Sequence, residues 1–304
     1  MRKEITGESC FGEYLNDGRR TIAELYWEYD RLLDFGFEKD LIYTQYILDE
    51  SMNGGSRSFP IFCYRSKRTN LGSLWLISGT HGEEPAGPEA IAAEIETLGR
   101  LGKTIPIVII PLCNPSGRFR DWRYENEYRD DSKGTSMTDA EHWLLQTGQP
   151  LPRREKAVCI GAEAITKYVL EGCFVFPPIV AIDFHEDTGL PESYVYSQSL
   201  SGENDPGAKL MVELMRQSGM EIQMEGETNV GEKVHNGIIS AVNDGSITEL
   251  MTAPRVFYKG QILDKPFARS AYVVETPVYG VALPKRVETH RRIIRSLEEI
   301  WKLA

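Results

Sequence analysis

The stretch from Leu76 to Pro85 (LISGTHGEEP) holds two metal-binding residue types only three positions apart. His81 and Glu84 lie where an apolar run, predicted to be a strand, gives way to a helix with prolines in its first turn. Across such a tight turn, an imidazole nitrogen and a carboxylate oxygen can converge on one cation. His-x-x-Glu is therefore a usable half-site for zinc, at the kind of strand end where α/β sheets bind ligands.

A catalytic zinc ion usually has three protein ligands and leaves a fourth position for water. The chain contains only five histidines, so few residues can complete the half-site. His142 falls in a predicted helix, His235 in a polar stretch and His290 in a charged terminal helix. His185 instead ends the apolar run IVAIDF, so we predict it as the third ligand. Asp183, on the same face of that strand, is the predicted partner that orients its imidazole.

Hydrolysis at a metal also needs a base, because zinc lowers the pKa of its water to roughly 7 and a carboxylate must carry the proton onward. Glu275 ends the apolar run AYVV and precedes Thr276-Pro277. A carboxylate placed there requires a partner or a function. We therefore predict Glu275 as the general base. Glu83 and Glu186 are interpreted instead as outward-facing charges, or as charges that favour a helix N-terminus.

In their order along the chain, these residues resemble those of a known family. The ordered set is His81-x-x-Glu84, Asn114-Pro115-x-Gly117, Trp122-Arg123, His185 and Glu275. It resembles the zinc carboxypeptidase family and its aspartoacylase/succinylglutamate desuccinylase relatives, over about residues 73–280. The resemblance implies one Zn²⁺ per chain, held by His81, Glu84 and His185. It also implies that Glu275 activates water and shuttles its proton.

Three further residues take their expected roles from this resemblance. Arg123 matches the family arginine that supports the developing oxyanion, a task suited to a planar and permanently charged guanidinium. The chain departs from the family at the substrate-carboxylate anchor, because it contains no Asn-Arg dipeptide. Arg129 is the nearest arginine on the expected side, so Arg129 and Asn114 are the predicted substrate-binding residues. The family's mobile tyrosine stays open between Tyr258, Tyr272 and Tyr279.

The elements that must position these residues alternate between helix and strand. Helices are expected at 21–37, 85–100, 153–171, 206–219 and 283–303. Strands are expected at 41–48, 59–66, 73–79, 105–113, 178–185, 192–198 and 269–277, with a hairpin joining the second and third and an irregular loop at 114–137. This alternation predicts an α/β protein with three layers, α/β/α, and a mixed, largely parallel central sheet. We expect a single catalytic domain over residues 1–304, with residues 1–40 forming an N-terminal helical extension.

Composition excludes several classes of partner. The chain has 304 residues and a net charge of -11, from 34 Lys plus Arg against 45 Asp plus Glu, which would repel nucleic acids and anionic membranes. Its longest uncharged apolar run, 172–182, has 11 residues, whereas a membrane-spanning helix needs ~20. No apolar segment follows the basic N-terminus, and the five cysteines form no Cys-x-x-Cys pair. We therefore expect a cytoplasmic protein with reduced thiols.

Together these features predict a zinc-dependent hydrolase that cleaves an amide bond, most simply a metallocarboxypeptidase acting on peptides. Two alternatives stay open. One is an N-acyl amino acid deacylase of the aspartoacylase/succinylglutamate desuccinylase type, and the other is a noncatalytic zinc-binding domain. The expected partner is a small-molecule or peptide substrate, and the sequence leaves the oligomeric state open.

Overall fold

The computed structural model of the protein describes residues 17–49, 55–66, 72–125, 139–199, 201–229, 231–240 and 243–304. The strands of its main sheet are β1 (Glu38–Asp49), β2 (Gly55–Arg65), β3 (Ser73–Ser78), β4 (Ile107–Ile110), β5 (Pro178–Asp187), β6 (Tyr194–Ser197), β7 (Glu225–Glu227), β8 (Lys233–His235), β9 (Ile238–Ser240) and β12 (Ser270–Pro277). Within the described residues they form one ten-stranded sheet in the order β1-β2-β4-β3-β5-β12-β6-β9-β8-β7. A separate hairpin pairs β10 (Arg255–Tyr258) with β11 (Gln261–Asp264).

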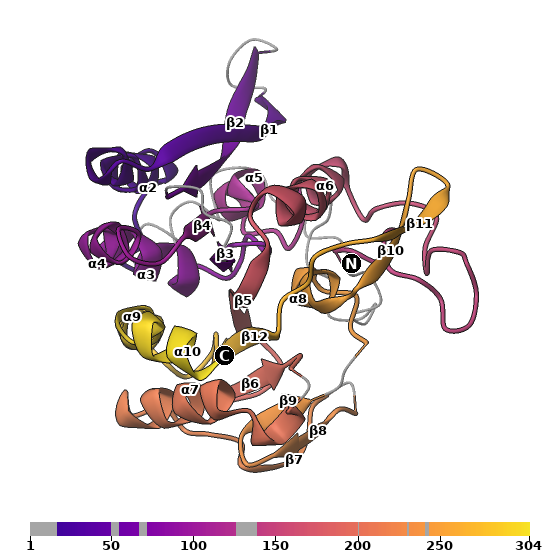
Figure 1. Cartoon of the computed structure of the whole chain (residues 1–304). Coiled ribbons are helices and arrows are strands. Elements are labelled where there is room, and N and C mark those ends of the chain that lie inside the picture. Colours follow the sequence, from indigo (N-terminus) through magenta and orange to yellow (C-terminus); the bar gives the residue numbers. More distant parts are fainter. Residues whose placement is uncertain are drawn as a thin grey trace, which may run out of the picture.

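The helices are α2 (Ile22–Asp30), α3 (Ala86–Ala93), α4 (Ile95–Leu101), α5 (Pro115–Arg120), α6 (Ile160–Val175), α7 (Pro206–Gln217), α8 (Ile247–Thr252), α9 (Leu283–Arg295) and α10 (Leu297–Leu303), with 3-10 turns η1 (Arg31–Phe35) and η3 (Gly202–Asn204). They cover both faces of the sheet (Figure 1). One face packs against α2, α3, α4, α7, α9 and α10, through strand residues such as Leu76 and Ile182. The other packs against α6 and α8, through Trp75 and Ile77. The predicted three-layer α/β fold is therefore confirmed.

The four central strands of the sheet are parallel to one another, and the strands outside them pair in both senses. Strands β4, β3, β5 and β12 run parallel to one another, whereas β2 joins β4 and β6 joins β12 in the antiparallel sense. Beyond β6, strand β9 pairs with it in parallel. Every residue of β3 and β4 is buried, as expected of apolar strands that have helices on both faces. The sheet is thus mixed, and the parallel character predicted from the alternation of helices and strands is found in the four central strands and in the β6–β9 pair.

The hairpin predicted between 59–66 and 73–79 is wrong. Strand β2 pairs with β1 and β4, while β3 lies between β4 and β5. Strand β3 is apolar on both faces, so burial is most complete when it lies inside the sheet instead of beside its neighbour in sequence. The turn residues between the two strands could not reveal this, because a turn signal does not specify which strands pair.

Two predicted helices are each divided in the structure. The helix expected at 85–100 changes direction at Glu94 (φ -116°), which ends α3 and precedes α4. The helix expected at 283–303 is divided at Ser296 between α9 and α10. Of the predicted N-terminal extension, residues 1–16 lie outside the described residues. The rest contains α2 and η1, with Leu25, Tyr29 and Leu32 buried in the core, and β1 begins at Glu38.

The described helices include none with the length and apolar character needed to cross a membrane. Among the described cysteines, Cys63, Cys113, Cys159 and Cys173 are free thiols, and all but Cys159 are buried.

Candidate metal centre

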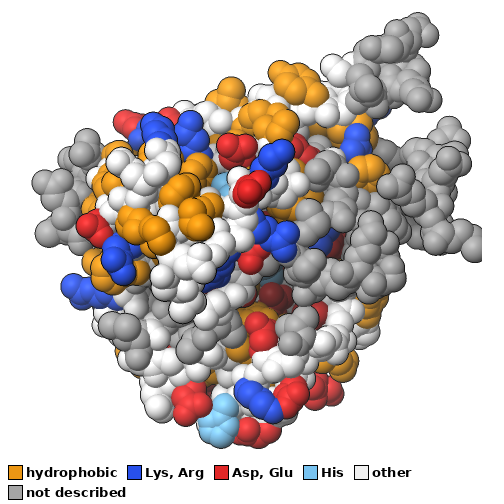
Figure 2. Space-filling model, turned by 90° about the vertical axis from the view of Figure 1, so that its right-hand side faces the viewer, with side chains coloured by type: hydrophobic (Ala, Val, Ile, Leu, Met, Phe, Trp, Pro, Cys, Tyr) orange, Lys and Arg blue, Asp and Glu red, His pale blue; other side chains and the backbone are white. Residues whose placement is uncertain are grey.

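The predicted site lies at the carboxyl ends of three neighbouring strands of the sheet, β3, β5 and β12. His81 and Glu84 follow β3, His185 lies in β5, and Glu275 lies in β12 directly opposite His185 in the parallel register. Because the three strands are parallel, their carboxyl ends meet at one edge of the sheet. Figure 2 shows a hollow in this face of the molecule, with acidic and basic side chains around it. The structure therefore brings together residues that lie far apart in the sequence.

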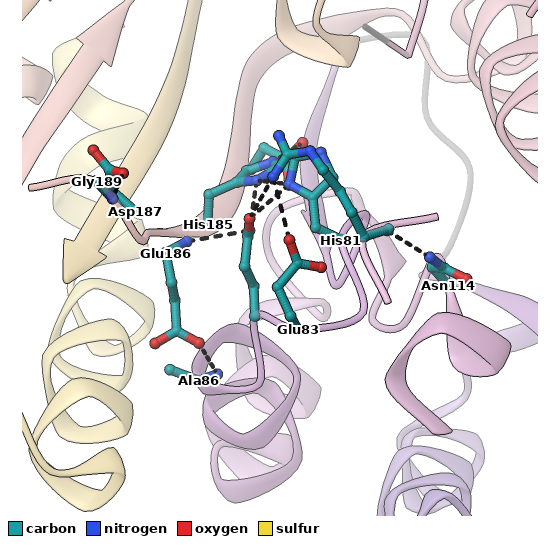
Figure 3. A network of polar contacts seen from close by, with 11 residues as sticks. His81, Glu83, Ala86, Asn114, His185, Glu186, Asp187 and Gly189 are labelled. Atoms are coloured by element: carbon teal, nitrogen blue, oxygen red, sulfur yellow. Dashed lines mark hydrogen bonds and ion pairs between the residues drawn. The ribbon is translucent and has the colours of Figure 1, made fainter. Parts of the chain in front are cut away.

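His81, Glu84 and His185 converge closely (Figure 3). The Nδ1 atom of His81 lies 2.7 Å from Glu84 Oε1, and the Nδ1 atom of His185 lies 2.8 Å from Glu84 Oε2. The two imidazole nitrogens are 3.2 Å apart. One potential ligand atom from each residue lies within 4.8 Å of the others, and within the described residues this trio is the group of three or more side chains able to hold a metal.

Burial and mutual attraction govern the charges of the trio. Burial lowers the pKa of His81 to about 3, and the positive charge of Arg123 acts in the same direction. Burial raises the pKa of Glu84, but attraction to His81 and His185 outweighs it and holds that pKa well below its usual range. Burial also lowers the pKa of His185, yet Asp183 and Glu84 outweigh burial and raise it well above its ordinary value.

Asp183 contacts the second nitrogen of His185. Its Oδ2 lies 3.0 Å from His185 Nε2, and its side chain is 1 % exposed. A carboxylate on one nitrogen of an imidazole fixes the tautomer and directs the other nitrogen outward, as is usual for metal-binding histidines. The pair arises locally, because residues two apart in a strand share a face.

Glu275 projects into the same region from β12. Its Oε2 atom is buried and has no hydrogen-bond partner among the described residues. Burial raises the pKa of Glu275 well above its usual value, with Glu84 and Asp187 acting in the same direction and His185 and Arg123 opposing them. This carboxylate therefore holds a proton more readily than an exposed one and has an oxygen available to a ligand.

Arg123 reaches the trio from the loop after α5. Its Nη1 lies 3.4 Å from both Glu83 Oε1 and Glu84 Oε1. The loop is docked by its backbone, since the Gly82 amide donates to the carbonyls of Trp122 (3.0 Å) and Arg123 (3.2 Å). Gly82 is required here, because a Cβ would lie 2.0 Å from the Gly117 carbonyl carbon. Position 82 is thus a close backbone approach that sets where the guanidinium lies.

Asn114 supports that loop from inside the protein. Its side chain caps α5 by accepting from the Gly117 amide at 2.9 Å, and its Nδ2 donates to the Arg123 carbonyl at 2.8 Å. It is 4 % exposed. The predicted irregular loop at 114–137 therefore begins with a short capped helix. The substrate contact predicted for Asn114 stays a prediction, and Arg129 lies outside the described residues.

The three candidate tyrosines occupy different environments. The hydroxyl of Tyr272 donates to Asp205 at 2.7 Å in the core. Its ring packs on the face of the sheet covered by α7 and α9, which is the face opposite to that of Glu275. The hydroxyl of Tyr258 donates to Glu171 of α6. Tyr279 is 66 % exposed just beyond β12. The structure therefore removes Tyr272 from the candidates, because its hydroxyl is hydrogen-bonded to Asp205 on the face of the sheet that does not carry the site.

Sequence reasoning missed other residues at the site. Tyr194 of β6 lies opposite Glu275 in the antiparallel register, and its hydroxyl donates to Asp187 at 2.6 Å. Tyr124 meets the His81 ring edge-on, with centroids 5.5 Å apart. The alternating pattern of 192–198 places Tyr194 on one face, but only strand pairing could place it beside Glu275.

The donor set fits zinc. Two imidazole nitrogens and one carboxylate form a ligand set that catalytic zinc sites use, and Asp183 supplies the outer carboxylate that such histidines usually have. The unpartnered Oε2 of Glu275 adds a buried polar atom that a ligand of the metal would satisfy.

Solved structures resemble this chain over most of its length. A proposed metallopeptidase from Shewanella amazonensis has a TM-score of 0.67 at 18% identity, over 90% of this chain and 89% of the other. Carboxypeptidase A from Helicoverpa armigera has a TM-score of 0.58 at 14% identity, over 94% and 74%. The chain has a carboxypeptidase-like fold.

A third solved structure with this carboxypeptidase-like fold contains a small molecule. It is a metallo-carboxypeptidase from Pseudomonas aeruginosa in complex with (2-guanidinoethylmercapto)succinic acid, with a TM-score of 0.50 at 16% identity, over 91% of this chain and 68% of the other. No protein-family model matches the sequence, and no curated protein matches it significantly. The family resemblance seen in the order of the site residues is therefore accompanied by a likeness of fold to solved carboxypeptidases.

Proposed function

We propose that the chain is a zinc-dependent hydrolase that cleaves an amide bond, acting as a metallocarboxypeptidase on peptides. In this proposal His81, Glu84 and His185 hold one Zn²⁺ per chain. Glu275 is the general base and Arg123 supports the oxyanion. The observation that carries the proposal is the convergence of three ligand atoms within 4.8 Å, with Glu275 on the adjacent strand directly opposite His185.

When bound, zinc with three protein ligands polarises a carbonyl oxygen and lowers the pKa of a coordinated water to roughly 7. The chain's own residues supply the rest. Glu275 accepts the proton of the attacking water at Oε2, the atom without a partner among the described residues, and returns it to the leaving amine. Burial raises the pKa of Glu275, which favours its protonated form, the form that returns the proton to the leaving amine.

Arg123 and Asp183 contribute through the groups beside which they lie, Glu84 and His185. The Arg123 guanidinium, 3.4 Å from Glu84, can donate to a substrate oxygen as negative charge develops there. Asp183 keeps the Nδ1 atom of His185 directed at the site. The close packing of Gly82 on the 122–123 backbone holds the guanidinium at a constant distance from the ligands.

The number of ligands favours an enzyme over a noncatalytic zinc domain. A structural zinc is almost always closed by four protein ligands, whereas the group found among the described residues has three members. A deacylase would use the same groups on an N-acyl amino acid. Turnover of blocked peptides, compared with turnover of N-acyl amino acids, separates the two activities.

The deciding experiment compares the wild-type protein with Glu275→Gln, which keeps the size of the side chain but cannot accept the proton. We expect the variant to bind one zinc ion, as the wild-type protein does, with a kcat lower by about 10²–10⁴-fold on blocked peptides. Glu299→Gln, at an exposed position of α10, is the control and should keep full activity. Unchanged turnover in Glu275→Gln, or a wild-type protein that binds no zinc, would overturn the proposal.

A further inference from the structure

Glu186 directly follows His185 in β5, and adjacent residues of a strand point to opposite faces. Its side chain therefore leaves the imidazoles and enters the layer between the sheet and helices α3 and α9 (Figure 3). Glu186 is 2 % exposed and Glu83 is 7 % exposed, so the interpretation of these two residues as outward-facing charges is wrong. A carboxylate so deeply buried requires partners.

Three contacts tie Glu186 to separate parts of the fold. Its Oε2 accepts from the backbone amide of Ala86, the first residue of α3, at 2.7 Å. Its Oε1 forms an ion pair with Nη1 of Arg286, which is buried on α9. Its own backbone amide donates to Glu84 Oε2 at 3.2 Å. Glu186 thus contacts Glu84, the start of α3 two residues after Glu84, and helix α9.

We infer that Glu186 and Arg286 are positioning residues for the metal site. Glu84 and His185 belong to chain segments about a hundred residues apart, so covalent geometry does not set the distance between them. Glu186 connects the two segments: it is fixed to His185 by a peptide bond, and it holds Ala86, two residues beyond Glu84, by a charge-assisted hydrogen bond. Arg286 holds the Glu186 carboxylate in the orientation that this hydrogen bond needs. The inference rests on the proposed zinc site.

A second buried ion pair, between Glu89 of α3 and Arg118 of α5, provides a matched control. Glu89 Oε1 lies 2.6 Å from Arg118 Nη2, and their side chains are 4 % and 3 % exposed, against 0 % and 7 % for Glu186 and Arg286. Glu89 lies on α3, the helix whose first residue Glu186 contacts. Its side chain contacts Arg118 and Arg20, and neither of these belongs to the metal-binding trio. Loss of either pair removes a buried ion pair. Only the Glu186–Arg286 pair lies between the two chain segments that carry the proposed metal ligands.

The experiment measures the zinc affinity of the full chain for the wild-type protein, Glu186→Gln and Glu89→Gln, by competition with a fluorescent chelator. Thermal unfolding is followed in parallel, and visible absorption is recorded with Co²⁺ in place of zinc. A glutamine at 186 still accepts from Ala86 but places an amide opposite the Arg286 guanidinium. We expect zinc affinity to fall by about 10–100-fold in Glu186→Gln and to stay close to wild type in Glu89→Gln, although both variants melt at lower temperature. Arg286→Lys, which keeps the charge, should lie between wild type and Glu186→Gln, and it serves as the test if Glu186→Gln does not fold.

The outcomes separate this inference from the proposed function. A Co²⁺ spectrum that changes in Glu186→Gln and not in Glu89→Gln supports a role in ligand geometry. Equal zinc affinities and equal Co²⁺ spectra in the two glutamine variants would overturn the positioning role while leaving the zinc hydrolase intact. A wild-type chain that binds neither ion would instead overturn the proposed function itself.

Discussion

The burial of His290 should make the protein lose stability in mild acid. His290 lies in α9, is 0 % exposed, and its Nε2 is 3.1 Å from the hydroxyl of Thr276, the residue after Glu275. Burial lowers the pKa of His290 from 6.5 to about 3, and the positive charges of Arg286 and His185 act in the same direction. The contact joins the strand that carries the predicted base to the helix behind it.

The sign and size of this effect follow from proton linkage. Below pH 6.5 the unfolded chain binds a proton at His290, while the folded chain stays neutral there down to about pH 3. Stability is therefore fully present above pH 6.5 and falls as the pH drops through this window, by up to about 1.4 kcal/mol per pH unit. Between pH 8 and pH 5 the loss from His290 is about 2 kcal/mol.

The measurement is urea-induced unfolding at pH 8 and pH 5 in the presence of a chelator, for the wild-type protein and His290→Gln. The variant cannot be protonated at this position, so it should lose about 2 kcal/mol less than wild type between the two pH values. Other titrating groups, including the buried His142, are present in both proteins and cancel in the difference. The control is His235→Gln, because Glu225 raises the pKa of this exposed histidine and the variant should not lessen the acid loss. Equal losses in wild type and His290→Gln would refute the reasoning.

Two further predictions concern the metal centre. Asp183→Asn removes the carboxylate 3.0 Å from His185 Nε2 and should weaken zinc binding by about 10–100-fold, measured by chelator competition; unchanged affinity would show that the imidazole needs no such partner. Gly82→Ala places a Cβ 2.0 Å from the backbone of Gly117 and should lower stability by about 1–3 kcal/mol while displacing Arg123, so that kcat on a blocked peptide falls even where the variant is folded. Full activity in a folded Gly82→Ala protein would contradict the role given to this close approach.

Local sequence patterns predicted the elements that lie at the centre of the fold. Strands β3, β5 and β12 were identifiable because each is an apolar run that ends in polar residues, and those residues are the candidate site. His81 and Glu84 could be paired from their spacing alone. Arg123, Asn114 and Arg129 took their roles from the family resemblance, and those roles stay predictions.

Long-range pairing is where sequence reasoning failed. The 59–66 and 73–79 hairpin was wrong because turn residues indicate a reversal without naming the partner strand, and β3 gains most burial in the interior of the sheet. The pairing of Tyr194 with Glu275 likewise depends on a crossover that brings β6 beside β12. The residue at which one predicted helix divides, Glu94, is contacted by Arg291 and Arg295, nearly two hundred positions away.

By itself, the sequence determined which side chains could do chemistry and that they stand at strand ends, because hydrophobic periodicity and residue type are local properties. Only the tertiary structure decided that His81, Glu84 and His185 meet within 4.8 Å, that Glu275 lies opposite His185, and that Glu186 is buried against Arg286. These distances depend on strand order and helix packing. Both are set by the burial of apolar surface throughout the chain, so no short segment contains the information.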